Sequence, residues 1–459
     1  MDSNRSQSRG LIMECSEFMK KKKYAAVGVG GRVTMFIDPI ADQYSEHCDL
    51  VGLCDTSLVR ATYHQKRLSL EYGIAPVPVY QDFDTMLHEQ KPDVVIVCTP
   101  DYLHDVFIVK SLEFGADVIS EKPLTTDAER FRRIHEAVAR TGRNVRTTFN
   151  MRWSPGITKV REVIAAGTIG RVRHVDFEYL LNTAHGADYF RRWHSQKECS
   201  GGLLVHKATH HFDLINWWID GIPELVYAQG DLVYYGKENA TERGDTQWTG
   251  YDRYTGRTEA DGDPFQLNLE ADPSMRALYR DAEEESGYIR DQNVFREGID
   301  IEDTMSLIVK FRTNETLSYS LNAYSPREGF RAAISGDRGR IEYEEFHASH
   351  IIKDGKEVAF SDEDCSATLI VQKHFSEPYE VEIPHAEGGH GGADPLLQEQ
   401  IFSPFSPFDP LMRSAGHEQG GASLLIGAAG NISMKTGQPV LVKDLFPLDP
   451  SAKHLHQLI

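Results

Sequence analysis

The sequence has no apolar run of about 20 residues, the length that a membrane-spanning helix needs. A short apolar patch near the N-terminus comes before the lysines at 20–23, the reverse of the order in a secretory signal. The six cysteines form no CxxC pair and have no regular spacing, which is typical of a reducing compartment. These absences predict a cytoplasmic protein that does not enter a membrane.

The chain also has fewer basic than acidic residues. The chain has 49 Lys and Arg against 69 Asp and Glu, a net charge of −20. Because proteins bind nucleic acid by neutralising its phosphates, this balance argues against a nucleic-acid partner. A local cluster such as Arg191 and Arg192 still allows an anionic small substrate. With 459 residues, 40% of them hydrophobic, the chain is long enough for two domains with real cores.

In the first third of the chain, predicted strands alternate with predicted helices. Short apolar strands are expected at 24–31, 49–55, 93–100 and 117–123, with helical segments such as 83–90 and 104–114 between them. Continuous apolar strands that alternate with helices predict an α/β fold with a parallel, doubly wound sheet. The expected division is a loose tail at 1–22, a dinucleotide-binding domain at 23–148 and a substrate domain at 149–459.

In the rest of the chain, apolar residues recur at every second position. Alternating strands are expected at 170–181, 224–235, 303–312, 316–323 and 330–343. They predict a large, mostly antiparallel sheet in an α+β domain, backed by a helix over 201–219. Residues 236–300 interrupt this sheet with a polar stretch too long for a hairpin loop. A lid, an oligomer contact and a surface excursion all remain open for it.

The segment "VGVGGR" (27–32) joins the first strand to a helix. Gly28 allows the tight turn, and Gly30 lets backbone N–H groups approach a pyrophosphate. Asp55, 25 positions after Gly30, ends the second strand, where a carboxylate accepts from ribose hydroxyls and repels a 2′-phosphate. NAD is therefore expected rather than NADP, although Arg32 could accommodate that phosphate. The expected contacts in the turn are Gly28, Gly30, Gly31 and Arg32.

The segment "GGLLVHKATHHFDLINWW" (201–218) contains an unusual number of titratable groups. On a helix, His206, His210 and Asp213 share one stripe, with Lys207 beside it. Burying such groups is costly unless they are paired or used. The two histidines also have the i, i+4 spacing of metal ligands, but a lysine follows the first and no third ligand stands out, so no metal is expected.

Together with the glycine turn and this helix, "CTPDYLH" (98–104), "EKPL" (121–124) and "NMRWSP" (150–155) resemble the Gfo/Idh/MocA family. This is the glucose–fructose oxidoreductase and inositol dehydrogenase group of sugar-modifying NAD(P) enzymes. The resemblance covers residues 24–235, resumes at 334–345 and returns weakly at 436–445. It implies a homo-oligomer, a dimer or a tetramer, because members bury the open face of the large sheet against a partner.

The resemblance also implies residue roles. Where members commonly have an aspartate four residues before the acid/base histidine, His210, this chain has His206. The implied catalytic residues are Lys122, His206 and His210. Implied cofactor contacts beyond the glycine turn and Asp55 are Thr99, Pro100, His104, Glu121, Lys122, Asn150 and Arg152.

The segment 181–202 lies between a strand and the titratable helix, so we expect it to line a sugar pocket. Arginine can clamp a carboxylate or sulfonate, and aromatic rings stack against sugar faces. The expected substrate contacts are Lys122, Tyr189, Arg191, Arg192, Trp193, His194, Lys207 and His210. A plain loop with solvated charges, a solvent-facing Lys207 and a core histidine at 210 bonded to Asp213 remain the alternatives. The glycine-rich stretch 385–395, with His385, His390 and Asp394, could reach the sugar or merely turn the chain.

The function predicted is an NAD-dependent oxidoreductase acting on a secondary hydroxyl of a sugar, glycoside or cyclitol. Histidine suits the proton transfer near neutral pH, and an ammonium such as Lys122 can hold the alkoxide. One alternative is a redox-neutral NAD-dependent glycoside hydrolase, which oxidises, eliminates, hydrates and reduces in turn. Another is a non-catalytic NAD(H)-binding regulatory protein.

Overall fold

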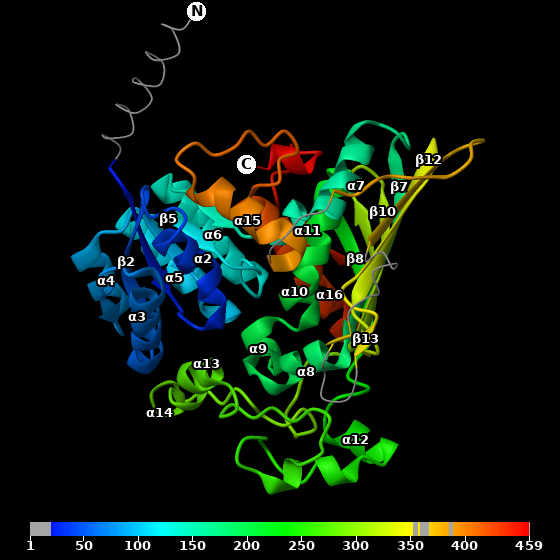
Figure 1. Ribbon diagram of the computed structural model, residues 1–459. Coiled ribbons are helices and arrows are strands. Elements are labelled where there is room, and N and C mark those ends of the chain that lie inside the picture. Colours follow the sequence, from blue (N-terminus) through cyan, green and yellow to red (C-terminus); the bar gives the residue numbers. More distant parts are fainter. Residues whose placement is uncertain (1–19, 352–356, 359–366, 385–388, 459) are drawn as a thin grey trace, which may run out of the picture.

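The computed structural model describes residues 20–351, 357–358, 367–384 and 389–458 (Figure 1). Most of the predicted tail and His385 lie outside the described residues. Within those ranges, no helix combines the length and the apolar composition that crossing a membrane requires.

The N-terminal part folds around a sheet in the order β17-β6-β5-β4-β1-β2-β3. Six strands are parallel, as predicted for a doubly wound fold, and β17 pairs antiparallel with β6 at the edge. The strands are β1 Lys22–Val27, β2 Cys48–Cys54, β3 Val79–Tyr80, β4 Val94–Val97, β5 Asp117–Ser120, β6 Val145–Thr147 and β17 Ala415–Gly416. The helices between them are α2 Thr34–Ala41, α3 Leu58–Tyr72, α4 Phe83–Gln90, α5 His104–Phe114 and α6 Ala128–Thr141.

Local sequence explains where these helices begin and end. The side chain of Ser57 caps α3 by accepting from the backbone N–H of Arg60, and Gly73 ends that helix with φ 68°. Asp127 and Gly142 do the same for α6. The strands between the helices are buried on both faces, with β4 buried at all four positions, which explains their continuous apolar sequence.

The C-terminal part contains a sheet in the order β16-β15-β12-β11-β7-β10-β9-β8-β18. Its central pair, β7 and β10, is parallel, and the other neighbours are antiparallel. The strands are β7 Val172–Asn182, β8 Pro223–Asp231, β9 Thr304–Phe311, β10 Thr316–Ser325, β11 Gly329–Gly336, β12 Gly339–Phe346, β15 Ala367–Lys373, β16 Tyr379–Glu380 and β18 Val440–Leu441, with a separate small pair β13 His350–Ile351 and β14 Glu357–Val358. The single strand expected at 330–343 is instead the hairpin of β11 and β12, because the chain turns between Gly336 and Gly339.

Helices cover one face of this sheet, and the other face is open (Figure 1). Ile308, in the middle of β9, is 50% exposed on the open side. The helices of this part are α7 Pro155–Ala165, α8 Thr183–Arg191, α9 Lys197–Ser200, α10 Leu203–His206, α11 Ala208–Ile219, α12 Lys237–Arg243, α13 Pro273–Met275, α14 Glu283–Ser286, α15 Gly389–Phe402, α16 His417–Thr436 and α17 Val442–Leu445.

Helix α16 packs against both parts of the molecule. A side chain at Gly421 would collide with the ring of Phe131 on α6, and one at Gly427 would collide with the backbone of Leu204 on α10. These glycines therefore let the helix approach both neighbours closely. The second domain predicted at 149–459 is not confined to the second sheet, because β17 joins the first sheet and α15 packs on α2.

Candidate functional site

The helix predicted over 201–219 is interrupted at Lys207, which separates α10 from α11. Gly201 and Gly202, with φ 69° and 72°, turn the chain into α10, a conformation that favours glycine. The single polar stripe predicted for this segment is therefore divided, and its members have different surroundings.

Asp213, on α11, is buried and paired. Both of its oxygens accept hydrogen bonds from Arg152, at 2.7 Å from Nε and 2.5 Å from Nη2, and the arginine is fully buried. Arg152 also donates to Gln419 on α16. The guanidinium of Arg152, an expected cofactor contact, therefore also has a structural role, because it joins α11 to α16.

His206 lies against the carboxyl edge of the first sheet. Its Nδ1 is 2.5 Å from Oδ2 of Asp101, a buried residue in the loop after β4. Lys122, in the loop after β5, places its Nζ 3.4 Å from the carbonyl oxygen of His206. Loops that follow neighbouring parallel strands meet at one edge, which explains how residues 21 positions apart in sequence reach the same histidine.

The charges of this group perturb one another. Burial lowers the pKa of Lys122 to about 8, although the carboxylates of Asp101 and Glu121 oppose the change. Burial also lowers the pKa of His206 and raises that of Asp101, because each charged form loses hydration. The result is a buried acid–base group in which burial disfavours the charged form of each member.

Aromatic rings surround His206. The ring centroids of His194, Tyr189 and Trp193 lie 4.2, 5.4 and 5.9 Å from that of His206, and Trp193 stacks on His194. The segment 181–202 that carries them is mainly helical, in α8 and α9, rather than a loop. His210 is 9% exposed, and its ring lies 6.1 Å from that of Phe149. The third histidine of the segment, His211, is a core residue bonded to Tyr319 at 2.7 Å.

A chain of polar contacts leads away from Tyr189. Its hydroxyl is 3.0 Å from Nε2 of His185, and Nδ1 of His185 is 2.8 Å from Oε1 of Glu328. Burial alone would raise the pKa of Glu328, but His185 and Lys207 lower it to about 2. Lys207 is buried over the ring of Tyr179, 4.8 Å from its centroid and 4.0 Å from Glu328. It therefore does not lie in solvent at the edge of a helix.

The two arginines of the segment share one carboxylate but differ in their other partners. Arg192 and Arg290, from the end of the insertion, donate to Asp188 at 3.4 and 2.7 Å, and Nε of Arg191 lies 3.9 Å from the same carboxylate. Arg191 also donates to the carbonyl of Phe265, in the 236–300 insertion, at 3.2 Å. Within the described residues, Nε of Arg192 and both Nε and Nη1 of Arg290 are buried without a hydrogen-bond acceptor. A buried guanidinium nitrogen without an acceptor is costly, so this position favours a bound anion.

The glycine turn has the shape that a dinucleotide requires. Gly28 has φ 80°, and a side chain there would collide with the backbone of Thr99, 2.5 Å away. A side chain at Gly30 or Gly31 would meet the hydroxyl of Tyr279, and no other described atom within 4 Å. The turn therefore brings backbone N–H groups to the start of a helical segment, as a pyrophosphate site does, and the hydroxyl of Tyr279 accepts from the N–H of Gly31 at 3.2 Å.

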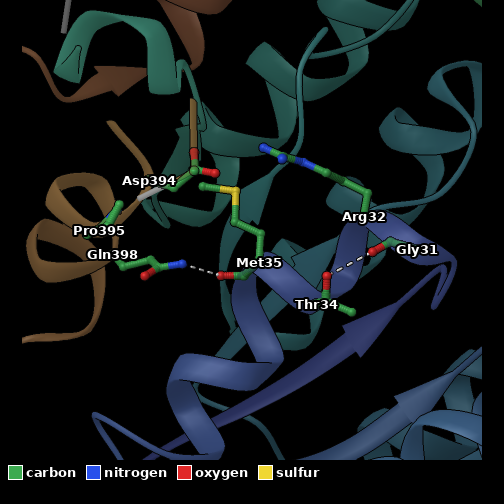
Figure 2. Close-up of a pocket in the computed structure, with 8 residues that line it drawn as sticks. Gly31, Arg32, Thr34, Met35, Asp394, Pro395 and Gln398 are labelled. Atoms are coloured by element: carbon green, nitrogen blue, oxygen red, sulfur yellow. Dashed lines mark hydrogen bonds between the residues drawn. The ribbon is translucent and has the colours of Figure 1, made fainter. Parts of the chain in front are cut away.

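A cavity of about 390 Å³ adjoins this turn (Figure 2). Gly31, Arg32 and Met35 line it from one side, and α15 lines it from the other through Asp394, Pro395 and Gln398. Asp394 accepts from the side chain of Asn150 at 2.9 Å. Asp394, which belongs to the glycine-rich stretch 385–395, therefore lies against the first domain and beside Asn150, an expected cofactor residue.

Two expected cofactor residues have other partners. The Nε of Arg32 is 2.7 Å from Glu121, so its guanidinium does not turn to Asp55 and the phosphate role considered for it is unsupported. Both ring nitrogens of His104 lie 2.8 Å from backbone carbonyls, of Pro123 and of Thr99. His104 therefore joins the loops that follow β4 and β5. Pro100 starts the short helical turn that holds Asp101.

Asp101, Asp188, Arg290 and Glu328 were not singled out in the sequence. Asp101 stands within the quoted "CTPDYLH", and its carboxylate supplies the acid that is missing at position 206. A signal for it was available, because polar residues directly after a parallel strand face the ligand edge. Arg290 and Glu328 carried no signal, since their contacts join residues more than 100 positions apart. Asp188 did carry one, because it stands three and four residues before Arg191 and Arg192, the spacing of ion pairs on a helix.

Both parts of the chain match models of one protein family. Residues 22–149 match the model of the oxidoreductase family with an NAD-binding Rossmann fold, and residues 161–442 match that family's C-terminal alpha/beta domain. The Bacillus subtilis protein named "Putative oxidoreductase YteT" is 36% identical over 442 residues, which cover 93% of this chain and 99% of that protein. An inositol 2-dehydrogenase of Rhizobium meliloti is 32% identical over 141 residues, 31% of this chain and 41% of the relative.

Solved structures share the fold. The WlbA dehydrogenase of Bordetella pertussis, in complex with NADH and UDP-GlcNAcA, has a TM-score of 0.59 at 18% identity and covers 92% of this chain and 99% of its own. An aldose-aldose oxidoreductase of Caulobacter crescentus has a TM-score of 0.59 at 17% identity, covering 92% of this chain and 100% of its own. With both family models matched in order along one chain, this protein belongs to the Gfo/Idh/MocA family of oxidoreductases.

Proposed function

We propose that this protein oxidises a secondary hydroxyl of a sugar, glycoside or cyclitol with NAD as the hydride acceptor. The observation that carries the proposal is the buried group of Lys122, Asp101 and His206 at the carboxyl edge of the first sheet. Ligands of open parallel sheets bind at this edge, and the glycine turn lies on the same sheet. The family and its sugar-metabolising members support the substrate class.

The chain's own residues supply the proton chemistry. A bound NAD would accept the hydride at C4 of its nicotinamide. The ammonium of Lys122 holds the reacting hydroxyl oxygen and stabilises negative charge as the proton leaves. His206, whose Nδ1 is held by Asp101, takes that proton at Nε2. His210, four residues later, is the second imidazole available to carry the proton onward.

The proposed substrate has an anionic group. Three arginines surround the single carboxylate of Asp188, and the buried nitrogens of Arg192 and Arg290 lack acceptors within the described residues. A carboxylate or sulfonate would satisfy these donors through paired hydrogen bonds. Tyr189 and Trp193 supply ring faces for the sugar itself.

The test is absorbance at 340 nm with NAD and a panel of pyranoses, uronates, sulfosugars and cyclitols. We expect NADH to form in proportion to one substrate, and His206→Asn or His210→Asn to reduce the rate by about 100-fold or more. His174→Asn is the matched control, because His174 lies on β7 beside Asp176, outside the site. A wild-type protein that binds NAD yet turns over no member of the panel, or a His210→Asn protein with full physiological function, would favour the regulatory alternative.

A redox-neutral glycosidase is the second candidate, favoured by the chain from Glu328 through His185 to Tyr189. Oxidation at C3 of a glycoside acidifies the C2–H, so a base can remove that proton while the C1 substituent leaves. Tyr189 would protonate the leaving oxygen, water would add at C1, and reduction of the ketone would restore the alcohol. Nitrophenol release from nitrophenyl glycosides without net NADH would identify this reaction.

A second copy of the chain is the proposed partner for the open face of the large sheet. A shallow cavity of about 530 Å³ lies on that face, lined by residues that include Tyr227, Ile308 and Arg331. Exposed apolar side chains on an open sheet favour association. Light scattering should give a mass that is a multiple of 51.8 kDa, and Ile308→Lys should reduce it.

A further inference from the structure

The 236–300 insertion returns to the first domain beside α3 (Figure 1). The hydroxyl of Tyr279 accepts from the backbone N–H of Gly31 at 3.2 Å, in the turn where a pyrophosphate would accept. The carbonyl of Leu278 accepts from Nε of Arg60 at 2.9 Å. Residues 278–285 of the insertion therefore run along the cofactor site, between its phosphate end and its adenosine end.

Glu285 reaches the adenosine end. Its Oε2 accepts from the hydroxyl of Ser57 at 2.7 Å and from the backbone N–H of Val59 at 3.1 Å. These donors follow Asp55 by two and four residues, at the N-terminus of the 15-residue helix α3. In this fold, the loop after the second strand lies beside the adenosine ribose, and its donors bind the 2′-phosphate in enzymes that use NADP.

The charges at this position oppose a phosphate. Arg60 is the guanidinium nearest to Asp55, but its Nη1 pairs with that carboxylate at 2.6 Å. Asp55 and Glu285 together contribute two negative charges against the one positive charge of Arg60. A 2′-phosphate would have to displace the Glu285 carboxylate from its donors, and the charge of Arg60 would still be offset by Asp55.

We propose that Glu285 makes the insertion a cofactor-selectivity element, which excludes NADP by occupying the donors that its 2′-phosphate would need. The inference rests on the proposed nicotinamide cofactor and adds a determinant that lies outside the dinucleotide-binding domain. Ribose hydroxyls are neutral, so NAD needs no displacement of Glu285.

The test is fluorescence titration of the full-length protein with NADH and with NADPH, without substrate. The wild type should bind NADH more tightly, and Glu285→Gln should tighten NADPH binding on the order of tenfold while NADH affinity stays within about twofold. Glu285→Asp, which keeps the charge, should retain the wild-type ratio. Glu284→Gln is the matched control, because this exposed neighbour changes the same charge on the same short helix.

The outcomes distinguish a failure of the selectivity inference from a failure of the proposed function. If wild type binds NADH and the ratio is the same in Glu285→Gln as in Glu284→Gln, the selectivity inference is wrong and the proposed function stands. A wild type that prefers NADPH also overturns the inference. A wild type that binds neither dinucleotide overturns the proposed function as well.

Discussion

Replacing Asp101 by Asn should slow catalysis through His206 rather than through the fold. The side chain keeps its size but loses the charge that accepts from His206 Nδ1 at 2.5 Å. A hydrogen bond to a charged group contributes about 1.5–3 kcal/mol. Since about 1.4 kcal/mol is a factor of ten, kcat/KM should fall by about 10- to 150-fold if the whole contribution acts in the transition state.

The assay is initial rate at 340 nm with the best substrate of the panel, across a range of pH. Because Asp101 is a positioning residue, the acidic limb of the pH profile should shift in Asp101→Asn, while NADH binding stays unchanged. A double variant with His206→Asn should be no slower than His206→Asn alone. Fully additive losses, or a fall in kcat/KM of less than twofold, would refute the view that Asp101 acts through His206.

Three further predictions follow from the site and its surroundings. The pKa of Lys122 is lowered to about 8, so the ammonium is charged below that pH and neutral above it. On the alkaline side, kcat/KM should therefore fall about tenfold per pH unit. A pH profile that still rises at pH 9 would contradict the ammonium role. Arg152→Met leaves Asp213 buried without its cation and should lower the free energy of unfolding by about 3–5 kcal/mol, measured by denaturant titration, without a selective loss of NADH affinity. Arg140→Met, at the Arg140–Glu113 pair whose side chains are both about half exposed, is the control and should cost less than about 1 kcal/mol; equal effects would show that burial does not set the size of the loss. Tyr189→Phe should slow hydrolysis of a methyl glycoside by about 100-fold or more, because an alkoxide needs a proton to leave, but should change nitrophenol release by less than about threefold, because nitrophenolate leaves without one; equal loss of both would argue against a leaving-group acid.

The sequence predicted the parts of the fold that depend on local periodicity. The parallel sheet and the antiparallel sheet both follow from apolar spacing over short windows, and these predictions are confirmed. The hairpin of β11 and β12 was read as one strand, because apolar alternation continues on both sides of its short turn. The break at Lys207 was also missed, since helical periodicity by itself does not register one irregular residue.

The site was only partly predictable for a related reason. The arrangement of Lys122 and His206 follows from two sheet-edge loops and one helix, which sequence motifs could indicate. Which partner each charge takes depends on three-dimensional packing, so the pairing of Arg152 with Asp213 was not predicted. Arg290 and Glu285 lie in the insertion, whose polar sequence gives no periodicity from which its path across the molecule could be inferred.

The short strand β17 has a consequence for the order in which the protein can be made. It closes the edge of the first sheet beside β6, and Phe402, at the end of α15, packs between Tyr24 and Tyr44 with ring centroids 5.4 and 5.7 Å away. As the chain leaves the ribosome, the N-terminal 150 residues emerge more than 250 residues before these covers exist. A nascent chain of that length has an unpaired strand edge and an uncovered aromatic surface, which are features that chaperones bind. The dinucleotide-binding unit therefore reaches its final form only when synthesis is almost finished.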